Sequence, residues 1–259
     1  MGRVLLRVAY DGTNYNGWQV QDNGRTIEGE LNKALTDIAG QEIVVIGASR
    51  TDAGVHALDN IAVFDYDGPL PADRFMYALN ARLPEDIRVQ SSYEVPSDYH
   101  PRKRTTIKTY EYSIYSAKVE LPIVSRYSYH TFYNVDVDKM REAAKYLVGE
   151  HDFKSFCNVK TSATTTVREV VSIDIDVKGS MIVLRISGKG FLYNMVRIIA
   201  GTLLEVGRGA LTPEDVKKIL DGYDRTLAGP TLPPCGLMLM SIAETEDENS
   251  NISDEECVD

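Results

Sequence analysis

The stretch Gly47-Ala-Ser-Arg-Thr-Asp-Ala-Gly-Val-His-Ala57 joins two apolar, β-branched runs, residues 43–46 and 61–64. This pattern predicts a short loop between two strands, and its glycines permit tight turns on either side of Asp52. Loops on a rigid sheet often carry functional groups. A solvated turn acid beside Arg50 is nevertheless the commoner structure for such a loop taken alone. The rest of the chain has to decide between these two interpretations.

Strand-like and helix-like patterns alternate along most of the chain. Further strands are predicted at residues 3–10, 87–95, 107–115, 167–177, 181–187 and 236–243, and helices at 27–38, 72–82, 136–148, 191–206 and 213–220. The order strand, helix, strand, strand, helix, strand of the first half has a counterpart in the second half. The pattern predicts an α+β fold of two similar halves, each an antiparallel sheet backed by helices, with a central cleft between them.

The composition changes at residues 96–106, which are rich in Pro and basic residues and are interpreted as the link between the halves. We expect an N-terminal half at residues 1–100, a C-terminal half at 101–243 and an acidic tail at 244–259. The tail has eight acids and no Lys or Arg, and is too poor in apolar residues to pack, which predicts disorder.

The overall composition, 43% hydrophobic and 25% charged, is typical of a soluble globular protein. No apolar stretch reaches the roughly 18–20 residues needed to span a bilayer, which argues against a membrane protein. Three cysteines without a Cys-x-x-Cys pair favour a cytoplasmic setting. The net charge of −10 comes mostly from the tail, because the chain without it has 28 basic and 30 acidic residues. A local basic cleft is therefore compatible with the acidic total.

Motifs for metals and common cofactors are missing. The four histidines and three cysteines show no metal-ligand spacing, and there is no nucleophile elbow, Walker loop or dinucleotide fingerprint. The sequence therefore predicts neither a metal nor a cofactor. Gly188-Lys-Gly190 is compatible with a phosphate cradle at a helix N-terminus, but a simple hairpin-to-helix turn is the commoner use of such residues.

Arg197 lies in a segment, residues 191–206, that is apolar on nearly every face and is expected to be buried. A buried arginine is costly unless a carboxylate or phosphate meets it. The alternatives are a side chain that extends to the surface or a purely structural ion pair.

Tyr110 and Tyr112 alternate with Glu111 along a predicted strand, which follows a run of basic residues. A strand that displays aromatic and basic side chains can stack nucleobases and hold phosphates. A half-buried, tyrosine-rich sheet face explains the same pattern. The basic residues are Arg102, Lys103, Arg104 and Lys108.

Five segments together resemble the TruA family of tRNA pseudouridine synthases, over essentially residues 3–243. They are Asp11-Gly-Thr-Asn-Tyr-Asn-Gly-Trp-Gln-Val-Gln21, Arg50-Thr-Asp-Ala-Gly-Val-His-Ala57, Lys108-Thr-Tyr-Glu-Tyr112, Gly190-Phe-Leu-Tyr-Asn-Met-Val-Arg197 and Ala228-Gly-Pro-Thr-Leu-Pro-Pro-Cys-Gly-Leu-Met-Leu239. The chain departs from the family pattern at Ser49, where glycine is usual, and at Asp59-Asn60, where Gly-Gln is common.

The resemblance implies a set of residue roles. Asp52 becomes the catalytic aspartate, Tyr110 the aromatic that stacks on the target base, and Arg197 the ion-pair partner of Asp52. Leu237 becomes the apolar wall of the base pocket. Contacts to RNA are expected from Arg50, Arg102, Lys103, Arg104 and Lys108.

The resemblance also implies the reaction and the partners. Uridine would be isomerised at tRNA positions 38 to 40 of the anticodon stem-loop, without metal or cofactor, by a cytoplasmic homodimer. Two other classes stay open on the residues alone: a non-catalytic RNA-binding module and a carboxylate-dependent glycosidase or nucleoside hydrolase. The second usually needs two carboxylates or a metal, and only Asp52 stands out here.

Overall fold

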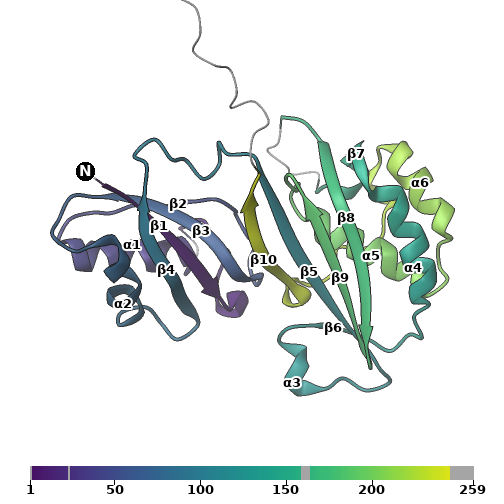
Figure 1. Ribbon diagram of the computed structural model, residues 1–259. Coiled ribbons are helices and arrows are strands. Elements are labelled where there is room, and N and C mark those ends of the chain that lie inside the picture. Colours follow the sequence, from purple (N-terminus) through teal and green to yellow (C-terminus); the bar gives the residue numbers. More distant parts are fainter. Residues whose placement is uncertain (1, 23, 159–163, 246–259) are drawn as a thin grey trace, which may run out of the picture.

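The computed structural model describes residues 2–22, 24–158 and 164–245 of the chain, and it is an α+β structure built on one large sheet (Figure 1). Eight strands follow in the order β4-β1-β3-β10-β5-β9-β8-β7, while β2 pairs with β3 and β6 pairs with β5. The strands are β1 (Gly2–Tyr10), β2 (Ile46–Gly47), β3 (His56–Tyr66), β4 (Ile87–Val95), β5 (Thr106–Ser116), β6 (Tyr129–Thr131), β7 (Gly149–Asp152), β8 (Val167–Lys178), β9 (Met181–Gly188) and β10 (Leu237–Glu244).

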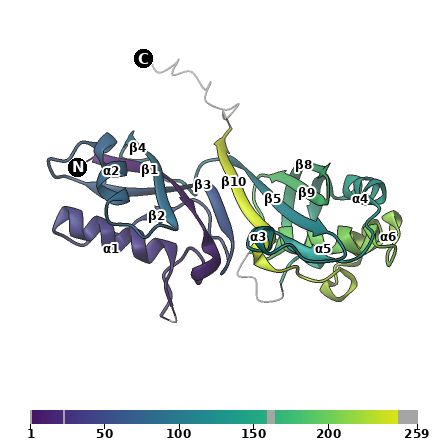
Figure 2. The same ribbon diagram turned by 90° about the horizontal axis from the view of Figure 1, so that it is seen from below.

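The helices divide between the two ends of this sheet (Figures 1 and 2). The N-terminal part carries α1 (Ile27–Ala39) and α2 (Phe75–Asn80), and the C-terminal part carries α4 (Val137–Ala144), α5 (Met195–Gly207) and α6 (Pro213–Gly222). A short helix, α3 (Pro122–Ser125), lies in the connection between β5 and β6. Every helix in the described residues is too short or too polar to span a bilayer.

Local sequence explains the best-predicted helix. Thr26 caps α1 by accepting the backbone N–H of Gly29 at 3.2 Å, as its position before an apolar period indicates. Gly40 ends the helix in the left-handed conformation, at φ 67°, which costs glycine little. Ile27, Leu31 and the other apolar residues at helical spacing face the core.

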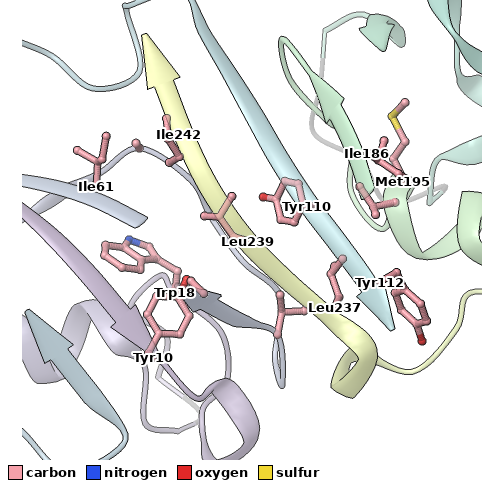
Figure 3. Packing of buried hydrophobic residues seen from close by; sticks show 14 of the residues in the cluster. Tyr10, Trp18, Ile61, Tyr110, Tyr112, Ile186, Met195, Leu237, Leu239 and Ile242 are labelled. Atoms are coloured by element: carbon pink, nitrogen blue, oxygen red, sulfur yellow. The ribbon is translucent and has the colours of Figure 1, made fainter. Parts of the chain in front are cut away.

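The last strand joins the two halves. β10 is parallel to β3 through the pair Leu239 and Ala57, and antiparallel to β5 from Leu237 opposite Tyr112 onward. The half-sheets expected from the sequence therefore form one continuous sheet, and its core runs across the junction. Figure 3 shows Leu239 between the aromatic side chains of the N-terminal half and Tyr110 of β5.

Several boundaries differ from the predictions. The strand expected at residues 43–46 is reduced to β2, and β3 begins at His56, directly after the loop. The helix expected from residue 191 begins only at Met195, because Asn194 adopts a left-handed backbone with φ 63°. Glu244, expected as the first residue of the tail, is the last residue of β10. The disorder predicted for the tail concerns residues 246–259, which lie outside the described residues.

Candidate active site

The loop that carries Asp52 lies between β2 and β3 and is held by the connection from β1 to α1. The carbonyl of Thr51 accepts the backbone N–H of Trp18 at 3.0 Å, and the N–H of Gly54 donates to the carbonyl of Tyr15 at 3.2 Å. Gly54 has φ 78°, where a side chain is strained, so the glycine predicted to permit a tight turn is needed here. These contacts fix the backbone on both sides of Asp52.

A cavity of about 980 Å³ opens beside this loop and is lined also by residues of β5, by the first residue of β10 and by the segment that leads into α5. Asp52, Tyr110 and Leu237 line it together, although they come from three separate segments of the sequence. The side chain of Leu237 is almost fully buried and supplies an apolar part of the lining. The structure thus brings together the acid, the aromatic and the apolar wall that the sequence predicts.

Arg197 stands behind Asp52. Its Nη1 lies 3.6 Å from Oδ2 of Asp52, and only 14% of its side chain is exposed. Two further hydrogen bonds hold the guanidinium: Nε donates to the carbonyl of Leu232 at 2.7 Å, and Nη1 donates to Oδ1 of Asn194 at 2.9 Å. The expected partnership between an arginine of the long helix and Asp52 is therefore present.

Two opposed effects act on the Asp52 carboxyl. Burial raises its pKa above the ordinary value for an aspartate, while the charge and hydrogen bonding of Arg197 act to lower it. The net direction is upward, so desolvation is the larger effect. Without Arg197 the carboxylate would be protonated at still higher pH.

Tyr110 and Tyr112, for which the sequence allows either contact with a nucleobase or burial in the sheet, differ in their positions. Tyr110 lines the cavity, its hydroxyl lies 3.0 Å from Oγ of Ser49, and its ring meets Phe191 edge-to-face at 5.3 Å. Burial, together with the negative charge of Asp52, raises the pKa of Tyr110 to about 12. Tyr112 is instead fully buried in the core and donates its hydroxyl to the carbonyl of Pro233. One tyrosine faces the site and the other belongs to the core.

The basic residues predicted to meet RNA differ in their placement. Arg50, Arg102, Arg104 and Lys108 line the cavity, whereas Lys103 is exposed and is not one of the lining residues. The Nζ of Lys108 donates to the carbonyl of Ala48 at 3.1 Å. Burial, and then the charge of Arg102, lower the pKa of Lys108 to about 8.

Arg102 and Arg104 both line the cavity, and they are held there by different contacts. The Nε of Arg102 donates to the carbonyl of Gly47 at 2.7 Å, and burial together with the charge of Arg50 lowers its pKa. Arg104 lies over the ring of Tyr99, at 5.1 Å from its centroid, and 4.0 Å from Oε2 of Glu244. Arg102 therefore binds the backbone of Gly47, while Arg104 is held by Tyr99 and Glu244.

The sequence interpretation missed two basic residues of the cavity lining. Arg168, near the start of β8, and Lys189, just after β9, both line the cavity. Lys189 forms an ion pair with Glu169 at 2.7 Å. The Gly188-Lys-Gly190 motif lies before α5 and not at its first turn, so the hairpin-to-helix interpretation is confirmed. Its lysine nevertheless belongs to the cavity, which no local signal revealed.

The departures from the family pattern have structural explanations. Asp59 pairs with Arg7 and is not a lining residue of the cavity. Asn60 is fully buried and donates to the carbonyl of Ser49 at 3.0 Å. Asp59 therefore introduces no negative charge into the lining, and Asn60 and Ser49 lie in contact with one another.

Within residues 2–22, 24–158 and 164–245, no group of three or more His, Cys, Asp or Glu side chains is placed to hold an ion. The acid of the cavity is Asp52, and Arg197 is the charged group that meets it.

Comparison with known proteins gives extensive matches. The sequence model of the family described as tRNA pseudouridine synthase matches residues 7–102 and 143–243. A protein named tRNA pseudouridine synthase A from Caldicellulosiruptor bescii is 45% identical over 242 residues, which cover 93% of this chain and 99% of that protein. One of the same name from Syntrophomonas wolfei is 43% identical, covering 95% of this chain and 99% of that protein.

Likeness to solved structures is weaker. A chain in a structure titled "Crystal Structure of a Cbf5-Nop10-Gar1 Complex" aligns with a TM-score of 0.37 and 12% identity, covering 91% of this chain and 57% of the other. This likeness is too low to support a conclusion about the site.

Proposed function

The chain belongs to the family of tRNA pseudouridine synthases, and from this premise we propose that it isomerises uridine in the anticodon stem-loop of tRNA, at positions 38 to 40, with Asp52 as the catalytic carboxylate. The enzyme is an isomerase: the bond between uracil N1 and the ribose breaks, the base turns, and a bond forms between the ribose and uracil C5. The hydrogen at C5 then leaves as a proton and N1 takes one up, so that the product is an isomer of the substrate. The reaction needs neither a redox partner nor a second substrate.

The observation that carries the proposal is the Asp52 carboxylate at the cavity, 3.6 Å from a cation that is itself held by two other hydrogen bonds. A carboxylate acts as a nucleophile, or stabilises developing positive charge, only in its ionised form. Burial favours the protonated form, and Arg197 offsets this effect. We assign Arg197 the role of keeping Asp52 ionised and oriented.

Tyr110 and Leu237 supply the surfaces for the base. Both side chains line the cavity close to Asp52, and aromatic stacking suits a uracil that has to be retained after its bond to the sugar breaks. A target uridine in a stem has to leave its stack before it reaches a recessed carboxylate. The cavity volume of about 980 Å³ is sufficient for a flipped-out nucleotide together with parts of its neighbours.

The basic residues of the cavity supply the phosphate contacts. Arg50, Arg102, Arg104 and Lys108 line the cavity, and the structure adds Arg168 and Lys189 to them. Cations around an opening attract a polyanion and fix its register without selecting a sequence. Lys103, which is exposed outside the lining, is proposed to meet RNA beyond the rim.

The remaining expectations follow from the family. We propose that residues 1–100 and 101–243 act as two halves that together enclose the substrate, and that the enzyme works as a homodimer in the cytoplasm. Neither a metal nor a cofactor is proposed, because isomerisation through a carboxylate requires neither.

The experiment that tests the function uses unmodified tRNA transcripts labelled with tritium at uridine C5. The proposed enzyme releases tritium to water and leaves pseudouridine in the anticodon stem-loop. Free uracil would show a hydrolase instead, and tight binding without release of tritium or uracil would show an RNA-binding module. Sequencing of the modified positions tests the assignment to positions 38 to 40.

A further inference from the structure

A buried hydrogen-bond network lies directly behind the Asp52 loop. Its centre is Asn60 on β3, whose side chain is fully buried. The Oδ1 of Asn60 accepts the backbone N–H of Ile61 at 2.9 Å, so its Nδ2 has to be the donor in its other contacts. The Nδ2 donates to the carbonyl of Ser49 at 3.0 Å and to the hydroxyl of Tyr10 at 3.2 Å.

The network continues from Tyr10 to the loop. The hydroxyl of Tyr10, which accepts from Asn60, also lies 2.7 Å from Oγ1 of Thr51, and either oxygen can donate in that contact. Asn60 thus fixes the loop at two points, directly through Ser49 and by way of Tyr10 through Thr51. These two residues, Ser49 and Thr51, flank Arg50, and Thr51 directly precedes Asp52.

Ser49 also reaches the other part of the site. Its Oγ lies 3.0 Å from the hydroxyl of Tyr110, and both residues are almost fully buried, at 5% and 7% exposure. Figure 3 shows Tyr10 and Tyr110 on opposite sides of β10, one in each half of the chain. The contact from Ser49 to Tyr110 therefore joins the loop of the N-terminal half to the aromatic strand of the C-terminal half.

We propose that Ser49 is a positioning residue, which is anchored by Asn60 through its carbonyl and fixes the Tyr110 hydroxyl relative to the Asp52 carboxylate. The inference rests on the proposed function, in which Asp52 is the catalytic carboxylate and Tyr110 is the aromatic that holds the base. Its physical basis is that an aromatic ring held only by packing can still turn its hydroxyl proton in several directions. A hydrogen bond from an immobile neighbour selects one direction, which matters most in a desolvated site. A residue without a hydroxyl at position 49 retains the backbone anchor and loses this selection.

The first test is Ser49→Ala, with Ser187→Ala as the matched control. The control removes the Ser187 hydroxyl, which lies 2.9 Å from the hydroxyl of Thr109. Thr109 precedes Tyr110 on β5, so the side chain of Thr109 points to the other face of the sheet. Under single-turnover conditions Ser49→Ala should slow isomerisation by about 3- to 10-fold, the range for one neutral hydrogen bond, with tRNA affinity unchanged. A loss no greater than that of Ser187→Ala overturns the inference.

A double-mutant cycle then asks whether Ser49 acts through Tyr110. In the Tyr110→Phe background the hydroxyl is already missing, so Ser49→Ala should add no further loss of rate. An equal loss in both backgrounds would show that Ser49 acts by packing the loop, and it would overturn the assignment to Tyr110.

A spectroscopic measurement separates this inference from the function itself. Tyrosines are labelled with ¹³C at Cζ, and the Tyr110 signal is assigned by its disappearance in Tyr110→Phe. In the free protein Ser49→Ala should shift that signal, and Ser187→Ala should not. An unmoved signal refutes the contact whether or not the protein is active. If the unaltered protein isomerises no uridine, the proposed function fails, and the positioning role fails with it even where the signal moves.

Discussion

The Nη1 of Arg197 lies 3.6 Å from Oδ2 of Asp52, and the same guanidinium donates to the carbonyl of Leu232 and to the side chain of Asn194. The arginine is therefore held in place independently of the acid it faces. Asn194 has a left-handed backbone and marks the start of α5, so the local turn before the helix sets the position of the cation. Such a fixed cation stabilises an ionised carboxylate without having to reorganise during the reaction.

The first prediction concerns the carboxylate itself. Asp52→Asn removes the group that we assign to catalysis, so isomerisation should fall by about 10³-fold or more, with tRNA affinity equal or slightly tighter. Affinity should not fall, because the substitution removes a negative charge from a cavity lined by cations. Tritium release from C5 and fluorescence anisotropy of labelled tRNA measure the two effects. Turnover close to that of the unaltered enzyme would contradict the assignment.

The second prediction concerns Arg197 and pH. Burial raises the pKa of Asp52, and Arg197 opposes this effect. Arg197→Met should therefore raise that pKa further, so that the carboxylate is protonated over a wider range of low pH. We expect a turnover reduced by about 10- to 100-fold, an affinity changed little, and the acidic limb of the rate profile moved to higher pH.

The control for Arg197 is Arg185→Met. Arg185 lies on β9 and pairs with Glu111, away from the cavity lining. Its loss should leave the rate profile unmoved, as expected for an exposed ion pair. A loss confined to affinity in Arg197→Met would instead identify Arg197 as a phosphate contact.

The third prediction concerns Lys108, whose pKa is lowered to about 8 by burial and by Arg102. The protonated form attracts phosphate, so the attraction is present below pH 8 and is lost as the pH rises through 8. Between pH 7 and 9 the affinity for tRNA should fall by up to about 10-fold, the limit set by the charged fraction. Lys108→Met should bind more weakly at pH 7 and show a smaller decline. Equal declines in the two proteins would exclude a phosphate contact by Lys108.

The fourth prediction compares two neighbours in the basic segment. Arg104 lines the cavity, and Lys103 is exposed beyond the lining. Arg104→Ala should weaken binding and reduce the slope of log affinity against log salt by about 1, the value for one phosphate contact. Lys103→Ala should have a smaller effect if its contact is made only at the outer surface. Identical slopes for both variants and for the unaltered protein would place the RNA path elsewhere.

The sequence specified the elements that local patterns determine. The cap at Thr26 and the terminating Gly40 predicted α1 because both act within a few residues of the chain. The alternation along residues 87–95 predicted β4 with its bounds, since period two identifies a strand directly. Local patterns failed at residues 191–194, where apolar residues continue the helical period although the chain turns. Asn194 adopts a left-handed backbone there, and the ring of Phe191 meets that of Tyr110 edge-to-face.

The candidate site was predictable only as far as its residue types were distinctive. A buried arginine needs an anion, but the pairing of Arg197 with Asp52 was implied by the family resemblance and not by the residue pattern. Lys189 could not be singled out in this way, because a lysine between glycines is common in turns. Its place in the candidate site follows only from the cavity that it lines. Ser49 is similar: its contact with Tyr110 depends on how two halves of the chain come together.

By itself, the sequence determined most of the strands and helices, the loop that carries Asp52 and the family. These depend on local periodicity, turn chemistry and motif spacing, which act over short distances along the chain. The tertiary structure alone decided that β10 lies between β3 and β5, joining both halves into one sheet. That placement brings Asp52 and Tyr110 to one cavity, with Arg197 lying 3.6 Å from the Asp52 carboxylate. Contacts between residues remote in sequence depend on how buried surfaces pack together, and local sequence patterns do not predict that packing.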